Sequence, residues 1–432
     1  MSRSRNVALW ALRIVVLFRL AFQAFFVPVY EGPDEPFHLA RVRMLSARID
    51  SKSLAGNEVD PQLARSVEAW PCGPSLHENV ECPAFGTEPA AFDILGPSRS
   101  GGREQRLANY QAHQPPLYYL AALPLLKLFA VFGTTTPEKQ LLLLRLFSLL
   151  LAALAILGPV RKLGRERALL ECALLVALLL PGAAESLIRV ANDASVFFWT
   201  SVVVERLSLR SRLPTAGIAV LSALGPLLKL TALPVVALAA AMGWRRNGWR
   251  SGFWIAVAGC TVFPLQWMRG WAWGGTLEAN VGSGMHESFG AVAFGLAHSG
   301  YIFFRTAAWL GGWSFFRPPT WLIVATPAVL LVVVWRTFRL RRPFENRIAH
   351  GVGLLVATLG FVAFAIGNHR LFGIWGGVGG WYLWGWAPWL ALGFSGRFEL
   401  REGRGREAIL AVLALVSVVQ ICWLQTALRL YG

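Results

Sequence analysis

Long apolar runs constrain this chain more than any other feature of its sequence. Residues 141–157 and 408–424 are mostly hydrophobic, and such runs approach the roughly 20 residues with which a helix crosses a lipid bilayer. Hydrophobic residues fill 55% of the 432 positions and charged residues only 15%, whereas soluble domains carry about 25% charged residues. The sequence therefore excludes a soluble globular protein and predicts an all-α, polytopic membrane protein.

Basic residues outnumber acidic residues by 41 to 24, which gives a net charge of +17. A nucleic-acid-binding surface would gather them in one stripe, but here they form short clusters between apolar runs, so we expect no nucleic-acid partner. Lys and Arg are enriched in the cytoplasmic loops of membrane proteins, and we interpret the clusters as topology markers. Together they hold 21 of the 41 basic residues: Arg3/Arg5, Arg161/Lys162/Arg165/Arg167, Arg206/Arg210/Arg212, Arg245/Arg246/Arg250, Arg336/Arg339/Arg341/Arg342/Arg347 and Arg397/Arg401/Arg404/Arg406.

If every cluster is cytoplasmic, each consecutive pair encloses an even number of spans. Only the first pair conflicts, because three apolar stretches lie between its members. Residues 115–132 begin with a Pro-Pro pair and carry Lys127 in their interior, so we expect an interfacial or re-entrant helix there. The other stretches predict about 11 transmembrane helices, within a range of 10–13, at residues 7–29, 140–159, 168–183, 194–207, 214–228, 231–243, 251–268, 321–335, 348–366, 381–396 and 407–427.

This threading makes residues 1–432 a single transmembrane domain with a cytoplasmic amino terminus and an extracytoplasmic carboxyl terminus. No cleavage site follows the first apolar stretch, so it reads as a retained helix. Residues 30–111 form one large extracytoplasmic loop with 12 acidic and 8 basic residues. Within it, Cys72 and Cys82 are close enough to form a disulfide in an oxidising compartment. Two unpaired thiols, or a metal site that includes His77, are the alternatives.

Adjacent carboxylates follow the first predicted span in the sequence Pro33-Asp-Glu-Pro-Phe-His38. Pro36 suits the first turn of a helix, so capping by Asp34 or Glu35 is the structural interpretation. Helical spacing also sets His38 and Arg41 near these acids, and capping explains only one carboxylate. A partly buried carboxylate beside a second one is suited to accept a proton from an attacking hydroxyl. We therefore treat Asp34 and Glu35 as candidate catalytic residues and His38 and Arg41 as substrate-binding candidates.

Further polar residues are expected at the outer ends of spans. His113 and Gln114 stand at the entry to the interfacial helix, fixed there by the following prolines. Arg189 and Asp193 are four residues apart, so a mutual ion pair and a substrate role are both open. Lys229 has no acid nearby in sequence and suits an anionic phosphate. The remaining substrate-binding candidates are Asn192, Arg317, Arg370 and Tyr382; the arginines stand among tryptophans that form either an interfacial belt or a carbohydrate groove.

These motifs resemble the GT-C class of integral membrane glycosyltransferases, and within it a bacterial family of uncharacterised membrane proteins with a Pro-Asp-Glu-x-x-His motif in the first loop. The resemblance covers nearly the whole chain, although each motif is short. The resemblance rests on the motifs Pro33–His38, His113-Gln-Pro-Pro-Leu-Tyr-Tyr119, Asn192-Asp193 and Lys229-Leu-Thr231.

The resemblance implies a GT-C-like fold in a bacterial inner membrane, with an extracytoplasmic active site. Such enzymes move a monosaccharide from a polyprenyl-phosphate donor to a glycan, lipid or protein acceptor, with inversion at the anomeric carbon. Carried over, Asp34 is the base and Glu35 supports it or binds a divalent cation, Mg or Mn. No other cofactor is implied. Lys229 and an outer arginine would hold the carrier phosphate.

The chain departs from the family near Gly379-Gly-Trp-Tyr-Leu383. Relatives often carry Arg where this chain has Trp381, so an inactive GT-C-like protein is one alternative. A transporter or flippase for a lipid-linked saccharide is the other. A transporter predicts charged residues deep in several spans, whereas the polar residues of this sequence gather at the expected outer face, and that distribution favours an enzyme.

Overall fold

A computed structural model describes most of the membrane-like part of the chain. The described residues are 3–27, 29–30, 34–49, 59–68, 114–131, 133, 136–166, 168–209, 214–264, 289–307, 321, 324, 328, 344–372, 375 and 379–394. They form helices and no strands, so the all-α class is as predicted. The positions Cys72, Cys82, His113 and Arg317, and the predicted span 407–427, lie outside them.

The helices follow one another closely along the chain. They are α1 (Arg3–Phe26), α2 (Glu35–Ile49), α3 (Pro61–Glu68), α4 (Leu117–Val131), α5 (Pro137–Ala155), η5 (Ile156–Val160), α6 (Arg161–Glu166), α7 (Ala168–Ala177), α8 (Pro181–Ile188), α9 (Asp193–Leu209), α10 (Thr215–Leu228), η6 (Leu230–Ala232), α11 (Leu233–Asn247), α12 (Trp249–Cys260), α14 (Phe289–Ala307), α16 (Phe344–Phe372), α17 (Tyr382–Gly385) and α18 (Ala387–Phe394).

Three described helices are long and apolar enough to cross a membrane: Asn6–Phe26, Pro137–Gly164 and Arg347–Arg370. A fourth crossing is possible if Leu170–Ala177 and Pro181–Ile188, which meet at a bend of 83°, count as one span. The chain is thus compatible with an all-α membrane protein. The 11 predicted spans are not established by these helices, because α10, α11 and α12 are shorter and residues 381–396 are divided between α17 and α18.

Local sequence explains where several helices begin and end. Pro137 and Pro181 each occupy the first turn of their helix, where a missing backbone N–H costs nothing. Gly248 separates α11 from α12 with φ of 91°, a left-handed conformation that a residue without a Cβ adopts without strain. These positions divide the long apolar stretches into shorter helices.

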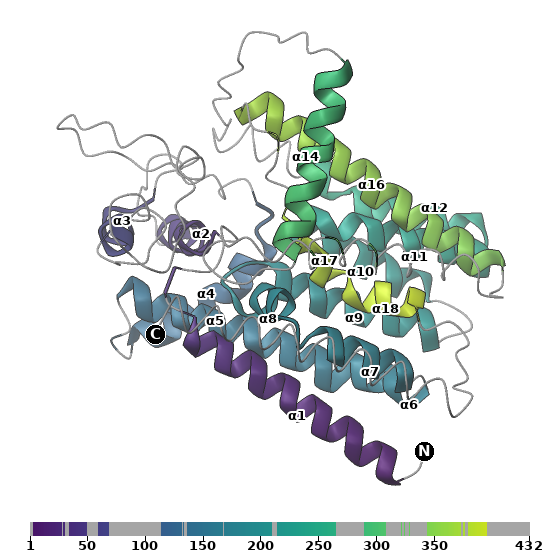
Figure 1. The fold of residues 1–432 in the computed structure, drawn as a ribbon, viewed down its shortest axis with the longest axis horizontal. Helices are drawn as coiled ribbons and strands as arrows, with labels where there is room; N and C mark the ends of the chain where they lie inside the picture. Colours follow the sequence, from purple (N-terminus) through teal and green to yellow (C-terminus); the bar gives the residue numbers. More distant parts are fainter. Residues whose placement is uncertain are drawn as a thin grey trace.

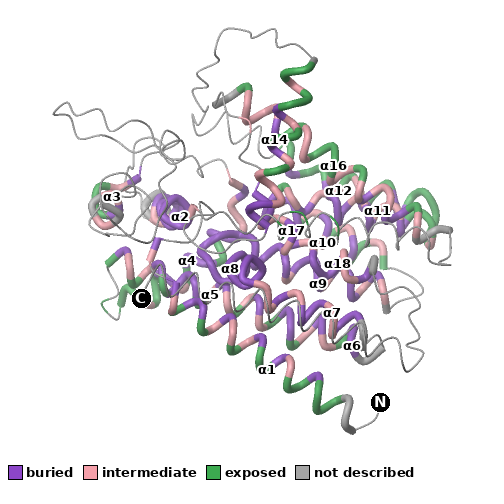
Figure 2. The backbone as a smooth tube through the Cα atoms, in the orientation of Figure 1, coloured by how far each residue is buried: buried purple, intermediate pink, exposed green. Residues whose placement is uncertain are grey.

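Helices α8 and α9 lie in the middle of the bundle, and α1 runs along one edge (Figures 1 and 2). Every residue of α8 is buried, whereas α1 exposes Phe18 and Phe25 and buries Val16 and Leu20. A helix with one apolar face turned outward suits contact with lipid. Buried polar side chains on α8 and α9 therefore sit in the protein interior, away from that lipid-facing side.

The hydrophobic core forms three clusters, and α9 contributes to two of them. One joins α2, α4 and α5 through side chains such as Tyr118 and Leu144. A second joins α9, α10, α11, α16 and α18, and it includes Trp389. The third joins α1, α5, α7 and α8, and it includes Phe197 of α9. The chain breaks after α1, α8 and α10 thus come together at one end of this core.

Candidate functional site

Asp34 occupies the turn that enters α2. Its φ of 64° lies in the left-handed region, and its carbonyl accepts hydrogen bonds from the backbone N–H groups of Phe37 and His38, both at 3.0 Å. The main chain of Asp34 thus starts the helix, as expected for a cap position, and its side chain is half-buried.

Glu35, the next residue, turns away from Asp34 into the bundle. Its carboxylate accepts hydrogen bonds from Nε and Nη2 of Arg145 on α5, at 2.8 and 2.6 Å, and one of its oxygens also accepts the backbone N–H of Val190 at 3.0 Å. Both side chains are almost completely buried. The two adjacent residues therefore differ in role: the Glu35 carboxylate is engaged in a buried ion pair, and the main chain of Asp34 starts the helix.

Asp193 forms the centre of a second charged group. Its carboxylate pairs with Arg189, across the break between α8 and α9, and with Nζ of Lys229 at 2.6 Å. The ion pair between Arg189 and Asp193 is one of the two alternatives left open by the sequence. The expectation that Lys229 is a lone cation is wrong, because its acid partner lies 36 residues away along the chain.

Burial and charge act in opposite directions on the ionisation of this group. Burial raises the pKa of Asp193, but the nearby Lys229 and Arg189 lower it, and the net pKa lies below the usual aspartate value. Burial lowers the pKa of Lys229, and the attraction of Asp193 offsets only part of that effect. The paired cations therefore favour the ionised form of the Asp193 carboxylate, while burial keeps the pKa of Lys229 below the usual lysine value.

Two aromatic residues at the start of α17 cover these cations. The guanidinium carbon of Arg189 lies 4.8 Å from the ring centre of Trp381, and Nζ of Lys229 lies 4.3 Å from the ring centre of Tyr382. Both distances are within the range of cation–π attraction. The site candidate Tyr382 thus lies over Lys229, and Trp381 lies over Arg189.

Gly380 sets the position of these two aromatic residues. Its N–H donates a hydrogen bond of 2.6 Å to Thr306 Oγ1 on α14, and a Cβ added at Gly380 would overlap the carbonyl oxygen of Phe303. The close approach of the two backbones therefore requires glycine.

Gly380→Ala is expected to destabilise the protein by about 1–3 kcal/mol, because overpacking forces the segment away from α14. A lower Tm in thermal unfolding of the purified protein would show it. Gly367→Ala is the matched control, since a Cβ at Gly367 on α16 meets no atom within 4 Å. Equal loss in both variants would contradict the role of close packing at Gly380.

Asp34 is linked to Arg189 and Lys229 by electrostatic interaction. The negative charge of Asp34 contributes to raising the pKa of Arg189 and Lys229 and also of Tyr119 and Tyr382. Asp34 therefore lies within electrostatic range of this group. The cluster, which we call the outer charge cluster, consists of Asp34, Arg189, Asp193, Lys229, Trp381 and Tyr382.

Several other candidates lie beside the cluster. His38 Nδ1 and the hydroxyl of Tyr119 are 2.7 Å apart, and the charge of buried Arg41 acts on the same tyrosine. Asn192 Nδ2 donates to the carbonyl of Leu228 at 2.8 Å and to Gln114 Oε1 at 3.5 Å. The polar residues of α2, α4 and α9 thus reach the same region.

Arg370 differs from the other described candidates. It is exposed at the last turn of α16, and the structure records no contact between it and the outer charge cluster. In the described ranges, no group of three or more His, Cys, Asp or Glu residues is arranged to hold a metal ion. Glu35 uses its carboxylate oxygens to bind Arg145 and Val190, so the two acids do not form a shared metal site in this arrangement.

Arg145 is the functional candidate that the sequence did not yield. It lies within the apolar run 141–157, and its guanidinium is buried among helices far apart in sequence. The signal was present, because a charged residue inside a membrane-type helix is costly and normally has a partner. Glu185 is similar: it is buried on α8 and accepts a hydrogen bond of 3.2 Å from Gln23.

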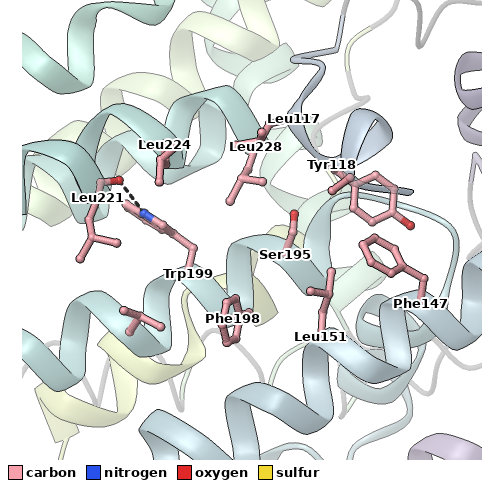
Figure 3. Close-up of a pocket in the computed structure, with 12 residues that line it drawn as sticks. Leu117, Tyr118, Phe147, Leu151, Ser195, Phe198, Trp199, Leu221, Leu224 and Leu228 are labelled. Carbon is pink, nitrogen blue, oxygen red and sulfur yellow. Dashed lines mark hydrogen bonds between the residues drawn. The ribbon is translucent and has the colours of Figure 1, made fainter. Parts of the chain in front are cut away.

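An apolar groove of about 360 Å³ lies beside the cluster. Figure 3 shows side chains of α9 and α10 facing each other across it, and Trp199 Nε1 donating to the carbonyl of Leu221 at 2.7 Å. Ser195 and Leu228, which line it, are near neighbours in sequence of Asp193 and Lys229. The lining residues are Leu117, Tyr118, Ala121, Phe147, Leu151, Ser195, Phe198, Trp199, Val202, Leu221, Leu224 and Leu228.

Comparison with known proteins adds no relative. No family model, curated protein or solved structure matches the chain. The class that the fold defines is an all-α membrane-type protein with a buried charge cluster next to an apolar groove.

Proposed function

We propose that this protein is a GT-C-type membrane glycosyltransferase that transfers a monosaccharide from a polyprenyl-phosphate donor to an acceptor hydroxyl. The observation that carries this proposal is the convergence of Asp34 with Lys229 and Arg189. A carboxylate within electrostatic range of two cations that suit a phosphate supports a base next to a phosphate-binding group. The resemblance of Pro33–His38 and the neighbouring motifs to GT-C enzymes supports the same function.

The proposed reaction is a direct displacement at the anomeric carbon of the sugar. The acceptor oxygen forms a bond to that carbon while the bond between the carbon and the phosphate oxygen breaks. The bonding electrons leave with the polyprenyl phosphate, whose negative charge Lys229 and Arg189 would stabilise. Asp34 takes the proton of the acceptor hydroxyl, which makes the hydroxyl a better nucleophile. Glu35 has no part in the proton transfer, because Arg145 binds its carboxylate.

The apolar groove supports a lipid-linked donor. Its lining is hydrophobic, and a prenyl chain gains about 0.8 kcal/mol for each methylene it buries. Two of its lining residues, Ser195 and Leu228, are close in sequence to Asp193 and Lys229 of the outer charge cluster. A donor with its phosphate near Lys229 would lay its chain between α9 and α10.

Leu224→Trp is expected to weaken binding of a long-chain polyprenyl phosphate by about tenfold, which corresponds to the loss of about two buried methylenes. Leu224 lines the groove and is partly exposed, so the larger ring would fill space needed by the chain. Binding of radiolabelled polyprenyl phosphate to the purified protein measures the effect. Val220→Trp, one turn earlier on α10 and 61% exposed, is the control. An unchanged affinity in Leu224→Trp would contradict this placement of the chain.

The proposal also includes the membrane topology and the acceptor that we expect from the sequence. We propose that the chain crosses a bacterial inner membrane 11 times, with the carboxyl terminus and the site on the outer side. Acceptor binding is assigned to the side of the site that carries His38, Arg41 and Gln114. The acceptor is a glycan, a lipid or a protein.

The function is tested by sugar transfer. Purified protein is incubated with a panel of polyprenyl phosphates that carry radiolabelled hexoses, and a bacterial envelope fraction supplies acceptors. We expect label to move from the lipid to the envelope fraction with at least one donor. No transfer with any donor would overturn the proposal.

A flippase for lipid-linked saccharide is the second candidate, and one observation favours it. Arg13, midway along α1, forms a buried ion pair of 2.6 Å with Glu171 of α7, so charged residues do not gather only at the expected outer face. Movement of labelled lipid-linked sugar across vesicles that contain the protein, without any transfer to acceptor, would support this function.

A further inference from the structure

We infer that the buried pair of Glu35 and Arg145 is a positioning device that holds the Asp34 carboxylate against the outer charge cluster. This inference rests on the proposed function, in which Asp34 is the base. Neither residue of the pair takes part in the proton transfer or the displacement. Each acts through the backbone turn that carries Asp34.

Arg145 joins two helix ends with one side chain. Two of its nitrogens bind the carboxylate of Glu35, which is the first residue of α2. Its Nη1 donates to the carbonyl of Ala24 at 3.3 Å and also to the carbonyl of Val27, at the end of α1. The guanidinium therefore ties the end of α1 to the start of α2, and Asp34 lies in the connection between them.

Glu35 also contacts the segment that follows Arg189. One of its oxygens accepts the backbone N–H of Val190, and Ser148, one turn after Arg145 on α5, donates to the carbonyl of Arg189 at 3.0 Å. The backbone that carries Arg189 is thus held by the same two elements that hold the turn of Asp34. The distance between base and cation is set by this shared support.

The backbone of Asp34 needs such support. A non-glycine residue with positive φ is uncommon, and it persists only where its surroundings fix it. Asp34 has φ of 64°. Because a buried pair at the next residue prevents the turn from relaxing, loss of the pair should let the Asp34 side chain move away from Lys229.

The position of residue 34 can be measured without the transfer reaction. The full-length chain, with its 5 native cysteines replaced by alanine, is given the substitution Asp34→Cys, and the rate of maleimide labelling is recorded with and without a long-chain polyprenyl phosphate. At ligand concentrations about ten times the dissociation constant, we expect about tenfold protection of the introduced thiol. Adding Arg145→Gln should lower protection to about twofold or less, while binding of radiolabelled polyprenyl phosphate is retained.

Three further variants separate positioning from general damage. Arg13→Gln breaks a different buried pair, between Arg13 and Glu171, and should leave protection of the introduced thiol intact. Glu35→Gln keeps the size of the side chain and removes its charge, so it decides the question if Arg145→Gln does not fold. Arg145→Lys, which keeps the positive charge, should restore part of the protection.

The outcomes distinguish this inference from the proposed function. Full protection in folded Arg145→Gln and Glu35→Gln proteins that still bind polyprenyl phosphate would overturn the positioning role and leave the proposed donor intact. Failure of the cysteine-replaced parent chain to bind polyprenyl phosphate at all would overturn both. In the transfer assay with native Asp34, a positioning role predicts lower kcat with little change in donor KM for Arg145→Lys, which a purely structural role would not produce.

Discussion

Replacing Asp34 by asparagine is expected to reduce sugar transfer by about 10²- to 10⁴-fold, the usual contribution of a general base. Asparagine has nearly the same shape but does not take the proton of the acceptor hydroxyl. Donor binding should not weaken, because the substitution removes a negative charge that acts on Lys229 and Arg189. The initial rate of transfer and the binding of radiolabelled polyprenyl phosphate, measured on the same preparation, test both parts.

Asp60→Asn provides the matched control for this experiment. Asp60 pairs with Arg43 at 2.8 Å, just before α3, and no contact links it to the outer charge cluster. We expect wild-type transfer from this variant. If Asp34→Asn retains wild-type turnover as well, the base lies elsewhere and the proposed mechanism is wrong.

Lys229→Met is expected to weaken binding of polyprenyl phosphate by about 10- to 100-fold, since a hydrogen bond to a charged group contributes about 1.5–3 kcal/mol. Methionine keeps much of the length of the side chain and loses the ammonium group that faces Asp193 and Tyr382. Direct binding of the radiolabelled lipid measures the loss. Arg189 continues to pair with Asp193, which should preserve the folded state.

Lys162→Met separates this effect from a general loss of positive charge. Lys162 is mostly exposed and lies 3.6 Å from Glu205, in a cluster that marks the expected cytoplasmic side. Its removal should leave binding unchanged. Equal weakening in the two variants would mean that the lipid phosphate responds to overall charge and does not contact Lys229.

The all-helical class followed from the long apolar runs of the sequence. The break between α10 and α11 falls at Lys229, where a charge interrupts two predicted spans. No span was predicted over residues 289–307, which form α14 (Phe289–Ala307). Where the residues on both sides of a helix boundary are equally hydrophobic, hydrophobicity does not locate that boundary.

The pairs that build the site were harder to foresee. Glu35 and Arg145 are 110 residues apart, and Lys229 and Asp193 are 36 apart. Local spacing identifies a pair such as Arg189 and Asp193, which are four residues apart, but it does not report contacts between distant helices. The sequence therefore supplied the residues of the outer charge cluster but assigned Lys229 no partner and left Arg145 out.

The groove between α9 and α10 has a consequence for how the proposed enzyme meets its donor. Leu224 and Ala121, which line it, are exposed on the side of the bundle, so a lipid-linked sugar would enter sideways with its chain still among the acyl chains. The relevant concentration is then the mole fraction of donor in the membrane. Diluting the donor with inert lipid at constant bulk concentration should slow transfer, whereas adding buffer to the vesicles should not.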